Sequence, residues 1–513
     1  MVTSGPAARL ALVLLALAAA AACTRPSQRA EGQDGSAGPA ASRAVLFVGA
    51  DLRGYVAPCG CSENMRGGIA RAAEQIALSR RSKVPTLFVE GGDSLFGPGP
   101  LQEAQVPQEE RKARALAQAF QQMGLSVRAR GELDDTRGEP FRRSLGLPEL
   151  DPGQARVLEA GAARVGVAAG STAAELLKAA QKARESGAVF VLGLYHQTLG
   201  EAQRLAADPA LQADLLVATH SAGAAADGGK LLGGGGAPVV QLQDKGQMML
   251  RVDLAFEGGA ARFEPLRTAE DAEKEAGALQ ERIALLNVQV NEPGIDRELH
   301  AMKQKKIEEL VARRAAVLSA PPPPMQGKNA FSIRLVPLDA ALPMEAAVKG
   351  TVDAYDRDVS TLNLEWAKKH GKDCPAPTAR EPGFVGTAAC AECHEDSMPV
   401  YRESKHAHAF ATLVDLGKQY HLNCVGCHVT GAYQPGGVCR VDKVAGRENV
   451  GCESCHGPGW AHSEDPTLKN IDRKPGEEVC VRCHEGENSP HFNFVKYLPQ
   501  ILGPGHGQPL KKK

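Results

Sequence analysis

Four Cys-x-x-Cys-His motifs lie close together near the C-terminal end of this 513-residue chain, at residues 390–394, 424–428, 452–456 and 480–484. This spacing is the attachment signature of c-type haem, in which two thiols bond to the haem vinyl groups and the adjacent imidazole ligates the iron. Zinc sites and disulfides also use paired cysteines, but neither explains a histidine directly after the second cysteine in every motif. The motifs therefore predict four covalently bound haem c groups and a role in electron transfer.

The motifs also predict which residues hold the haems. We expect thioether bonds from eight cysteines: Cys390, Cys393, Cys424, Cys427, Cys452, Cys455, Cys480 and Cys483. We expect proximal iron ligands from His394, His428, His456 and His484. A short segment with so many haems cannot have an ordinary hydrophobic core, because the porphyrins themselves supply much of the buried apolar surface.

Further histidines in the same segment are candidates for the distal iron ligands. They are His406, His408, His421, His462, His491 and His506. Each is either a distal ligand or an ordinary surface histidine, and spacing alone does not decide between the two.

The order of these motifs resembles the cytochrome c554 family over about residues 384–507. The resemblance rests on Ser-Lys-His-Ala-His-Ala at 404–409 between two motifs, and on Cys-His-Gly-Pro-Gly at 455–459 followed by His462. It implies mostly bis-histidine haems in closely stacked pairs, sometimes with one five-coordinate iron. By motif match it implies distal ligation by His406 and His462, with His491 and His506 as further candidates. Whether one iron is open to small molecules is left undecided.

The N-terminus resembles an export signal. Arg9 ends a short leading region, and residues 11–22 form an apolar stretch too short to span a bilayer comfortably. Cys23 follows three alanines, which resembles a bacterial lipoprotein cleavage box; the alternative is plain cleavage without lipidation. We expect a signal peptide at 1–23, a flexible tether at 24–43, and a lipid-anchored protein on the periplasmic side of the bacterial cell envelope. No second run reaches membrane-spanning length.

Residues 44–266 predict a layered α/β domain. Short apolar runs predict buried strands at 45–48, 86–89, 165–168, 189–194 and 215–218, and helical patterns at 70–79, 109–123 and 173–186 lie between them. The fold class is therefore α/β: a layered sandwich, then a charged helical hairpin, then a mainly α and irregular multihaem cytochrome c domain.

Residues at the ends of these strands resemble calcineurin-like metallophosphatases of the 5′-nucleotidase branch. That family binds two metals with the patterns D-x-H, GD, GNHE, a lone His and GHxH. Here the patterns read Asp-Leu-Arg at 51–53, Ala-Arg-Gly-Glu at 129–132 and Thr-His-Ser-Ala at 219–222, so several ligands are replaced. The resemblance implies a metallophosphatase-like fold without its dimetal site, because Arg53 and Arg130 would repel divalent cations. We expect a second metal site to be missing, although four positions still match: Asp51, Asp93, His196 and His220.

Two cysteines near this expected cleft lie in the sequence Pro-Cys-Gly-Cys at 58–61. Neighbouring thiols on a glycine-containing loop favour redox or soft-metal chemistry at Cys59 and Cys61. The match also resembles a nucleotidase-like subgroup in which selenocysteine occurs at a neighbouring position. The alternative is a structural pair in an oxidising compartment.

Residues 267–320 have apolar residues at helical spacing in a strongly charged background. Leu279, Ile283, Leu286 and Val290 precede a break at 291–294, after which Leu299, Met302, Ile307 and Leu310 resume the pattern. This predicts a helical hairpin or short coiled coil. Residues 321–383 predict a linker and connecting segment with one strand at 332–337 and a helix at 359–370, and residues 384–513 predict the haem domain. Cys374 and Cys439 are left over and could pair with one another.

Charge gives no reason to expect a nucleic-acid partner, because 59 Lys and Arg nearly balance 60 Asp and Glu. We favour an electron carrier whose partners are redox proteins of the cell envelope, with the N-terminal domain serving docking or thiol redox. The second hypothesis is an oxidoreductase that acts on a small molecule at an open haem or at Cys59 and Cys61. The third is an active metallophosphatase fused to a cytochrome.

Overall fold

The computed structural model describes residues 42–58, 65–220, 230–232, 236–256, 262–266, 269–290, 296–319, 329–467, 470–484, 489 and 492–510. These described residues belong to one compact unit. The predicted signal peptide with Cys23, the pair Cys59 and Cys61, and His491 lie outside the described residues. Within the described ranges, no helix combines the length and the apolar character needed to cross a bilayer.

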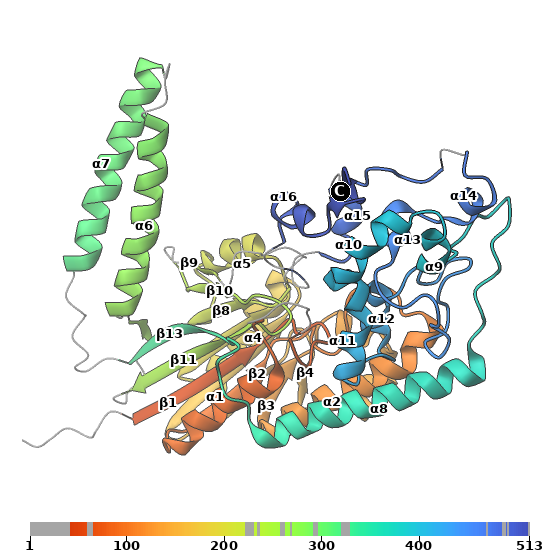
Figure 1. The fold of residues 1–513 in the computed structure, drawn as a ribbon. Coiled ribbons are helices and arrows are strands. Elements are labelled where there is room, and N and C mark those ends of the chain that lie inside the picture. Colours follow the sequence, from red (N-terminus) through yellow and green to blue (C-terminus); the bar gives the residue numbers. More distant parts are fainter. Residues whose placement is uncertain are drawn as a thin grey trace, which may run out of the picture. The chain divides into compact units, whose positions relative to one another are not determined.

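The first sheet has seven strands in the order β12-β13-β11-β1-β2-β3-β4 (Figure 1). Parallel pairing joins β1 to β2, β2 to β3 and β3 to β4, whereas β11 is antiparallel to both β1 and β13. The strands are β1 Ser42–Gly49, β2 Thr86–Glu90, β3 Leu125–Ala129, β4 Glu149–Leu150, β11 Met248–Phe256, β12 Glu264–Pro265 and β13 Ala330–Pro337. The strands predicted at 45–48, 86–89 and 332–337 are present, and the last of them extends this sheet beyond β11.

The second sheet has six strands in the order β5-β6-β7-β8-β10-β9. They are β5 Ala155–Ala160, β6 Ala163–Gly170, β7 Phe190–Tyr195, β8 Leu215–Ala218, β9 Lys230–Leu232 and β10 Val239–Gln241. All residues of β7 and β8 are buried, as in parallel strands that are covered on both faces. The continuous apolar runs that predict these strands reflect this double burial.

Alternation along β1 shows how the layers are built. Leu46 and Val48 join the core between the two sheets, whereas Val45 and Phe47 pack against helices on the outer side. Those helices are α1 Ile69–Arg81, α2 Val106–Gln122 and α8 Ala346–His370, and the second sheet packs against α4 Ala173–Glu185 and α5 Leu199–Ala206. The layered α/β sandwich is confirmed.

Helix α8 is longer than the helix predicted at 359–370. Its first half carries Val348, Val352 and Tyr355, and these pack with Val359 in the same cluster as residues of α1 and α2. Glu345 caps the helix by accepting a hydrogen bond from the backbone N–H of Val348 at 2.8 Å. The buried apolar face of its first half and the cap at Glu345 together explain why the helix starts at Ala346 and not at the predicted residue 359.

The predicted helical hairpin is formed by α6 Ala269–Val290 and α7 Arg297–Ser319, which lie side by side (Figure 1). On α6, Ile283, Leu286 and Val290 are buried, as their spacing predicts. On α7, however, Leu299 and Met302 are exposed. The helical hairpin is therefore present, and these two residues of its apolar pattern face solvent.

The C-terminal region consists of short helices joined by turns. They include α9 Thr387–Ala391, α10 Met398–Glu403, α11 Ala409–Asp415, α12 Leu422–His428, α13 Cys452–His456, α14 Trp460–Glu464, α15 Glu477–Cys480 and α16 Phe494–Tyr497. A small buried apolar cluster comprises Ala367, Leu413, Val425, Val429, Val438 and Val441. A disulfide joins Cys374 to Cys439, the pair that the motifs leave over.

Candidate functional site: histidine pairs and a strand-end cluster

Among the residues that the structure describes, three histidine pairs each join a motif histidine to a histidine outside the motifs. The ring centroids of His394 and His462 lie 6.4 Å apart, and the planes of the two rings differ by 24°. The centroids of His484 and His406 lie 6.1 Å apart. Those of the third pair are also 6.1 Å apart, and its members are His456 and His506.

These separations fit two imidazoles on opposite sides of one iron. An imidazole nitrogen binds a metal at about 2 Å, so two such nitrogens lie about 4 Å apart and the ring centroids about 6 Å apart. Rings in direct stacking contact lie closer, as His484 and Phe492 do at 4.7 Å. The residues present therefore fit the haem that the motifs imply.

Hydrogen bonds orient several of these rings. His428 donates its Nδ1 proton to the Ala409 carbonyl oxygen at 2.6 Å, and His456 donates to the Asp472 carbonyl at 2.5 Å. Because a carbonyl oxygen can only accept, the proton is on Nδ1 in both rings, and Nε2 is the nitrogen suited to a metal. His506 makes the same kind of bond at 2.8 Å.

Burial favours the neutral form of the ring, which is the form that ligates a metal. Burial lowers the pKa of His406, with a smaller contribution from His484, and it also lowers the pKa of His484. Two further histidines use Nε2 for hydrogen bonds: Nε2 of His408 and Nε2 of His421 each donate to a backbone carbonyl oxygen at 3.0 Å. That arrangement does not leave their Nε2 atoms for a metal.

The thiols of the first and third haem motifs are in contact. A hydrogen bond between the Cys390 and Cys452 thiols is the largest cause that lowers the pKa of Cys452 to about 7 and raises the pKa of Cys390. The attachment points of the first and third motifs are therefore neighbours in space, although they are far apart in sequence.

A second cluster lies at the strand ends of the α/β sandwich. One ligand atom from each of Asp93, His196 and His220 lies within 4.8 Å of the other two, and Asp93 is almost fully buried. Oδ2 of Asp93 is 3.2 Å from His220 Nδ1 and 3.5 Å from His196 Nε2. Burial lowers the pKa of His196, an effect that the Asp93 carboxylate opposes. Such a set could hold one metal ion.

A cavity of about 490 Å³ adjoins this cluster. Its lining includes His196, His220, Arg130, Glu132 and Ser171. The Arg130 guanidinium lies 3.3 Å from Asp135 and 3.4 Å from Asp151, so acidic side chains compensate its charge at the cavity wall.

Asp51 and Arg53 lie on the loop after β1, next to the loop that carries Asp93. The backbone N–H of Asp51 donates to the Gly92 carbonyl at 3.0 Å, and that of Arg53 donates to the Asp93 carbonyl at 2.9 Å. The Arg53 side chain forms an ion pair with Asp244 at 3.1 Å. Asp51, Arg53 and Asp93 all have positive φ, a backbone strain that concentrates at functional sites.

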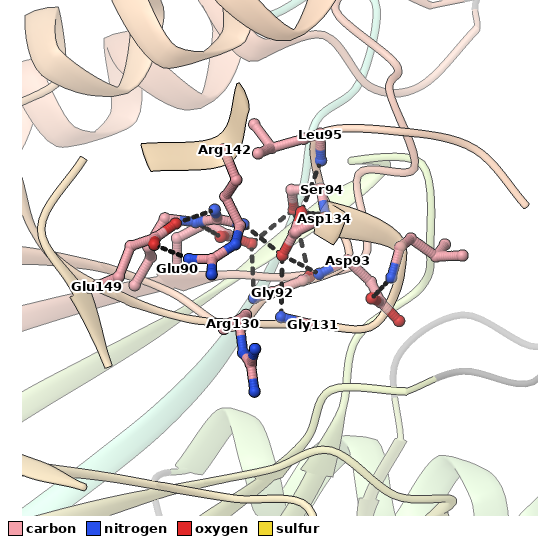
Figure 2. A network of polar contacts seen from close by, with 12 residues as sticks. Glu90, Gly92, Asp93, Ser94, Leu95, Arg130, Gly131, Asp134, Arg142 and Glu149 are labelled. Atoms are coloured by element: carbon pink, nitrogen blue, oxygen red, sulfur yellow. Dashed lines mark hydrogen bonds and ion pairs between the residues drawn. The ribbon is translucent and has the colours of Figure 1, made fainter. Parts of the chain in front are cut away.

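Asp134 holds the Asp93 loop in place (Figure 2). One of its carboxylate oxygens accepts the backbone N–H groups of Ser94 and Leu95, and the other accepts those of Asp93 and Gly131, at 2.9–3.0 Å. The sequence reasoning missed this residue, because in the sequence Asp134 is only one of two neighbouring aspartates in a turn.

Arg128 is fully buried and completes the same network. It pairs with Glu90 at 3.0 Å, Asp134 at 2.5 Å and Glu149 at 3.0 Å. Burial raises the pKa of Glu90 to about 7, although the Arg128 charge works against this. The sequence does indicate that such a network exists, because an arginine inside the short strand β3 is buried and needs carboxylate partners. It does not indicate which carboxylates these are.

Polar contacts connect α2 and α8 to the helix of the second motif. Oε1 of the buried Gln108 accepts hydrogen bonds from Asn363 Nδ2 at 2.6 Å and from the backbone N–H of Leu422 at 3.0 Å. Asn423 donates to Glu109 at 3.2 Å. The α/β sandwich and the haem-binding segment are therefore joined through α12.

The haem-attachment motifs and the paired imidazoles beside them define a c-type cytochrome. Through this C-terminal segment the chain belongs to the cytochrome c554 family: residues 389–457 match the family model for cytochrome c554 and c-prime. The cytochrome c-554 of Nitrosomonas europaea is 34% identical over an alignment that covers 23% of this chain and 67% of that protein. Cytochromes of this class carry covalently bound haem c.

Solved structures similar to the chain include 5′-nucleotidase-type proteins. A 5′-nucleotidase precursor from Thermus thermophilus has a TM-score of 0.38 and 14% identity, over 68% of this chain and 63% of that one. The sulfate thiohydrolase SoxB from the same organism has a TM-score of 0.39 and 14% identity, over 66% and 63%. The chain spans less than two thirds of each structure, and likeness at this level carries no argument about function.

Proposed function

We propose that this chain is an exported cytochrome that carries four haem c groups and transfers electrons. The observation that supports the proposal best is the set of three histidine pairs, each at a separation that fits one iron. A bound haem c supplies reversible one-electron iron chemistry. The motif thiols would attach the haem and the paired imidazoles would ligate its iron, and Nδ1 hydrogen bonds to backbone carbonyls fix the orientation of several of these rings.

On the basis of these pairs we propose distal ligands for three motifs. His462 serves the first motif, His506 the third and His406 the fourth. For the second motif, whose expected proximal ligand is His428, we propose no distal ligand.

Haem counting tests the main proposal. The haem absorbance of the denatured, purified protein in alkaline pyridine, divided by protein concentration, should correspond to four haems per chain after expression with a maturation system. A count below four would overturn the proposed haem content.

Carbon monoxide tests the ligand assignment, because it binds only an iron with an open position. The variant His462→Ala should bind one more equivalent of carbon monoxide per chain than the natural protein does. His408→Ala is the matched control, since the ring of His408 holds the Arg402 carbonyl, and it should add none. Equal binding by the two variants would refute the assignment. Carbon monoxide binding by the natural protein would favour the alternative of an oxidoreductase with an open haem.

For the α/β sandwich we propose a docking or thiol-redox role without a dimetal site. Three of the four matching positions form one cluster, but Arg53 pairs with Asp244 and Arg130 with acidic residues where further ligands would be needed. Metal analysis should find fewer than two ions per chain besides haem iron, and phosphatase turnover should be at background. Two manganese, zinc or iron ions with phosphatase turnover would revive the metallophosphatase hypothesis.

The proposed setting is the periplasmic side of a bacterial cell envelope, with a lipid anchor at Cys23 and redox proteins of the envelope as partners. The variant Cys23→Ser should move the mature protein from the membrane fraction to the soluble periplasmic fraction. Retention of the variant in the membrane fraction would contradict the anchor.

A further inference from the structure

Glu453 lies inside the third haem motif, yet its side chain reaches two other segments, and both of these lead into residues that we assign to the first haem. The residue is 3% exposed. Its carboxylate accepts the backbone N–H groups of Val385 at 2.9 Å and Gly386 at 2.7 Å. It also accepts the N–H of Gly459 at 2.7 Å.

These amides stand at two helix starts that carry haem-binding residues. Val385 and Gly386 directly precede α9, whose Cys390 begins the first motif. Gly459 directly precedes α14, which carries His462. One carboxylate therefore connects the proximal side and the distal side of the first haem site.

Position 386 in this arrangement accommodates only glycine. Its φ is +89°, which L side chains rarely adopt, and an added Cβ would lie 2.7 Å from the Gly446 carbonyl oxygen. The backbone thus presents its N–H to Glu453 from a position that only glycine accommodates.

The same carboxylate is close to the thiols that attach two haems. The thiols of Cys390 and Cys452 interact most strongly with each other, and the Glu453 charge opposes ionisation of both. Both oxygens of the Glu453 carboxylate accept backbone N–H groups, so the side chain is held in place beside these thiols. A buried anion is screened little by solvent and stabilises the more positive, oxidised state of a nearby iron.

We propose that Glu453 is a positioning residue for the first haem and that its buried charge lowers the reduction potentials of the haems bound at the first and third motifs. This rests on the proposed tetrahaem function. The second and fourth motifs have no hydrogen bond to Glu453 among the described residues, so their haems feel the charge less.

The test measures haem reduction potentials by spectroelectrochemical titration of the full-length holoprotein. Glu453→Gln removes the charge but retains one carbonyl oxygen, and the potentials of two haems should rise while the other two change less. Glu478→Gln is the matched control: Glu478 accepts the Gly476 N–H beside the fourth motif but is exposed, so solvent screens its charge. Shifts no larger than those of the control would overturn the electrostatic role.

Positioning has its own readout. Glu453→Ala should loosen α14 and make the iron ligated by His394 accessible to carbon monoxide, whereas Glu453→Gln should not. In the natural protein the amides of Val385, Gly386 and Gly459 should be protected from hydrogen exchange, and rapid exchange at all three would overturn the positioning role without any variant. A haem count below four in the natural protein would instead count against the proposed function, so the two failures are distinguishable.

Discussion

Replacing Asp134 by alanine tests whether the buried network holds the α/β sandwich together. The substitution removes the acceptor of four backbone N–H groups, those of Asp93, Ser94, Leu95 and Gly131. It also takes one of three carboxylates from the fully buried Arg128.

The size of the effect follows from these contacts. A buried donor without a partner costs about 1–3 kcal/mol, so four such amides would cost about 4 kcal/mol or more. Water that enters the space left by the carboxylate would bond to some of these amides and reduce this cost. Arg128 keeps Glu90 and Glu149, and for that reason the loss of the ion pair adds less than a fully uncompensated buried charge would. We expect Asp134→Ala to lower the free energy of unfolding by about 4–6 kcal/mol.

Asp135→Ala is the matched control. Asp135 is next in sequence and pairs with Arg142 and Arg130, but a third of its side chain is exposed. Solvent screens a partly exposed carboxylate, so its ion pairs contribute about 1 kcal/mol or less. Urea unfolding followed by far-UV circular dichroism, together with hydrogen exchange of peptides from 86–95, should separate the two variants by at least about 3 kcal/mol. Equal destabilisation by both substitutions would refute the reasoning.

Single contacts elsewhere lead to three more expectations. Burial raises the pKa of Glu90 to about 7 in the folded protein, above that of an unfolded glutamate, so the stability that it contributes at low pH should fall as pH rises from about 4.5 to 7. Urea unfolding midpoints measured between about pH 4.5 and 8 should show this decline, and Glu90→Gln should flatten it. Replacing Cys374 and Cys439 by serine opens a bridge between residues 65 apart and should cost about 4 kcal/mol by chain entropy, measured by urea unfolding; a loss below about 1 kcal/mol would contradict the chain-entropy argument. Asn363→Ala removes a 2.6 Å bond to Gln108 and should speed hydrogen exchange in α12 while leaving α1 unchanged.

Local sequence patterns predict the parts of this protein that depend on neighbouring residues. Apolar runs are enough for β7 and β8 because both strands are buried on two faces. The motifs predict the haem-attachment residues from sequence alone because thiol and imidazole must stand at fixed spacing in one short segment. His406 and His462 are predicted from family resemblance, and each lies opposite a motif histidine.

Features that depend on distant partners are not predictable in this way. Asp134 matters because it meets Arg128 from another element and the Asp93 loop, and no spacing in the sequence indicates that meeting. His506 can be assigned to the third motif only once its ring is placed beside His456. On α7, Leu299 and Met302 have helical spacing, but both side chains are exposed to solvent.

The Cys374–Cys439 disulfide has a consequence for the order in which the cysteines of a growing chain are used. Synthesis from the N-terminus releases Cys374 before the four thiols of the first two motifs, and Cys439 only after them. An oxidant that joined neighbouring cysteines as they emerged would link Cys374 to Cys390. The native bridge forms directly when the intervening thiols stay reduced or have already reacted with haem by the time Cys439 is available; otherwise thiol–disulfide exchange must rearrange it. The sequence thus couples haem attachment to the oxidation of a cysteine pair that binds no haem.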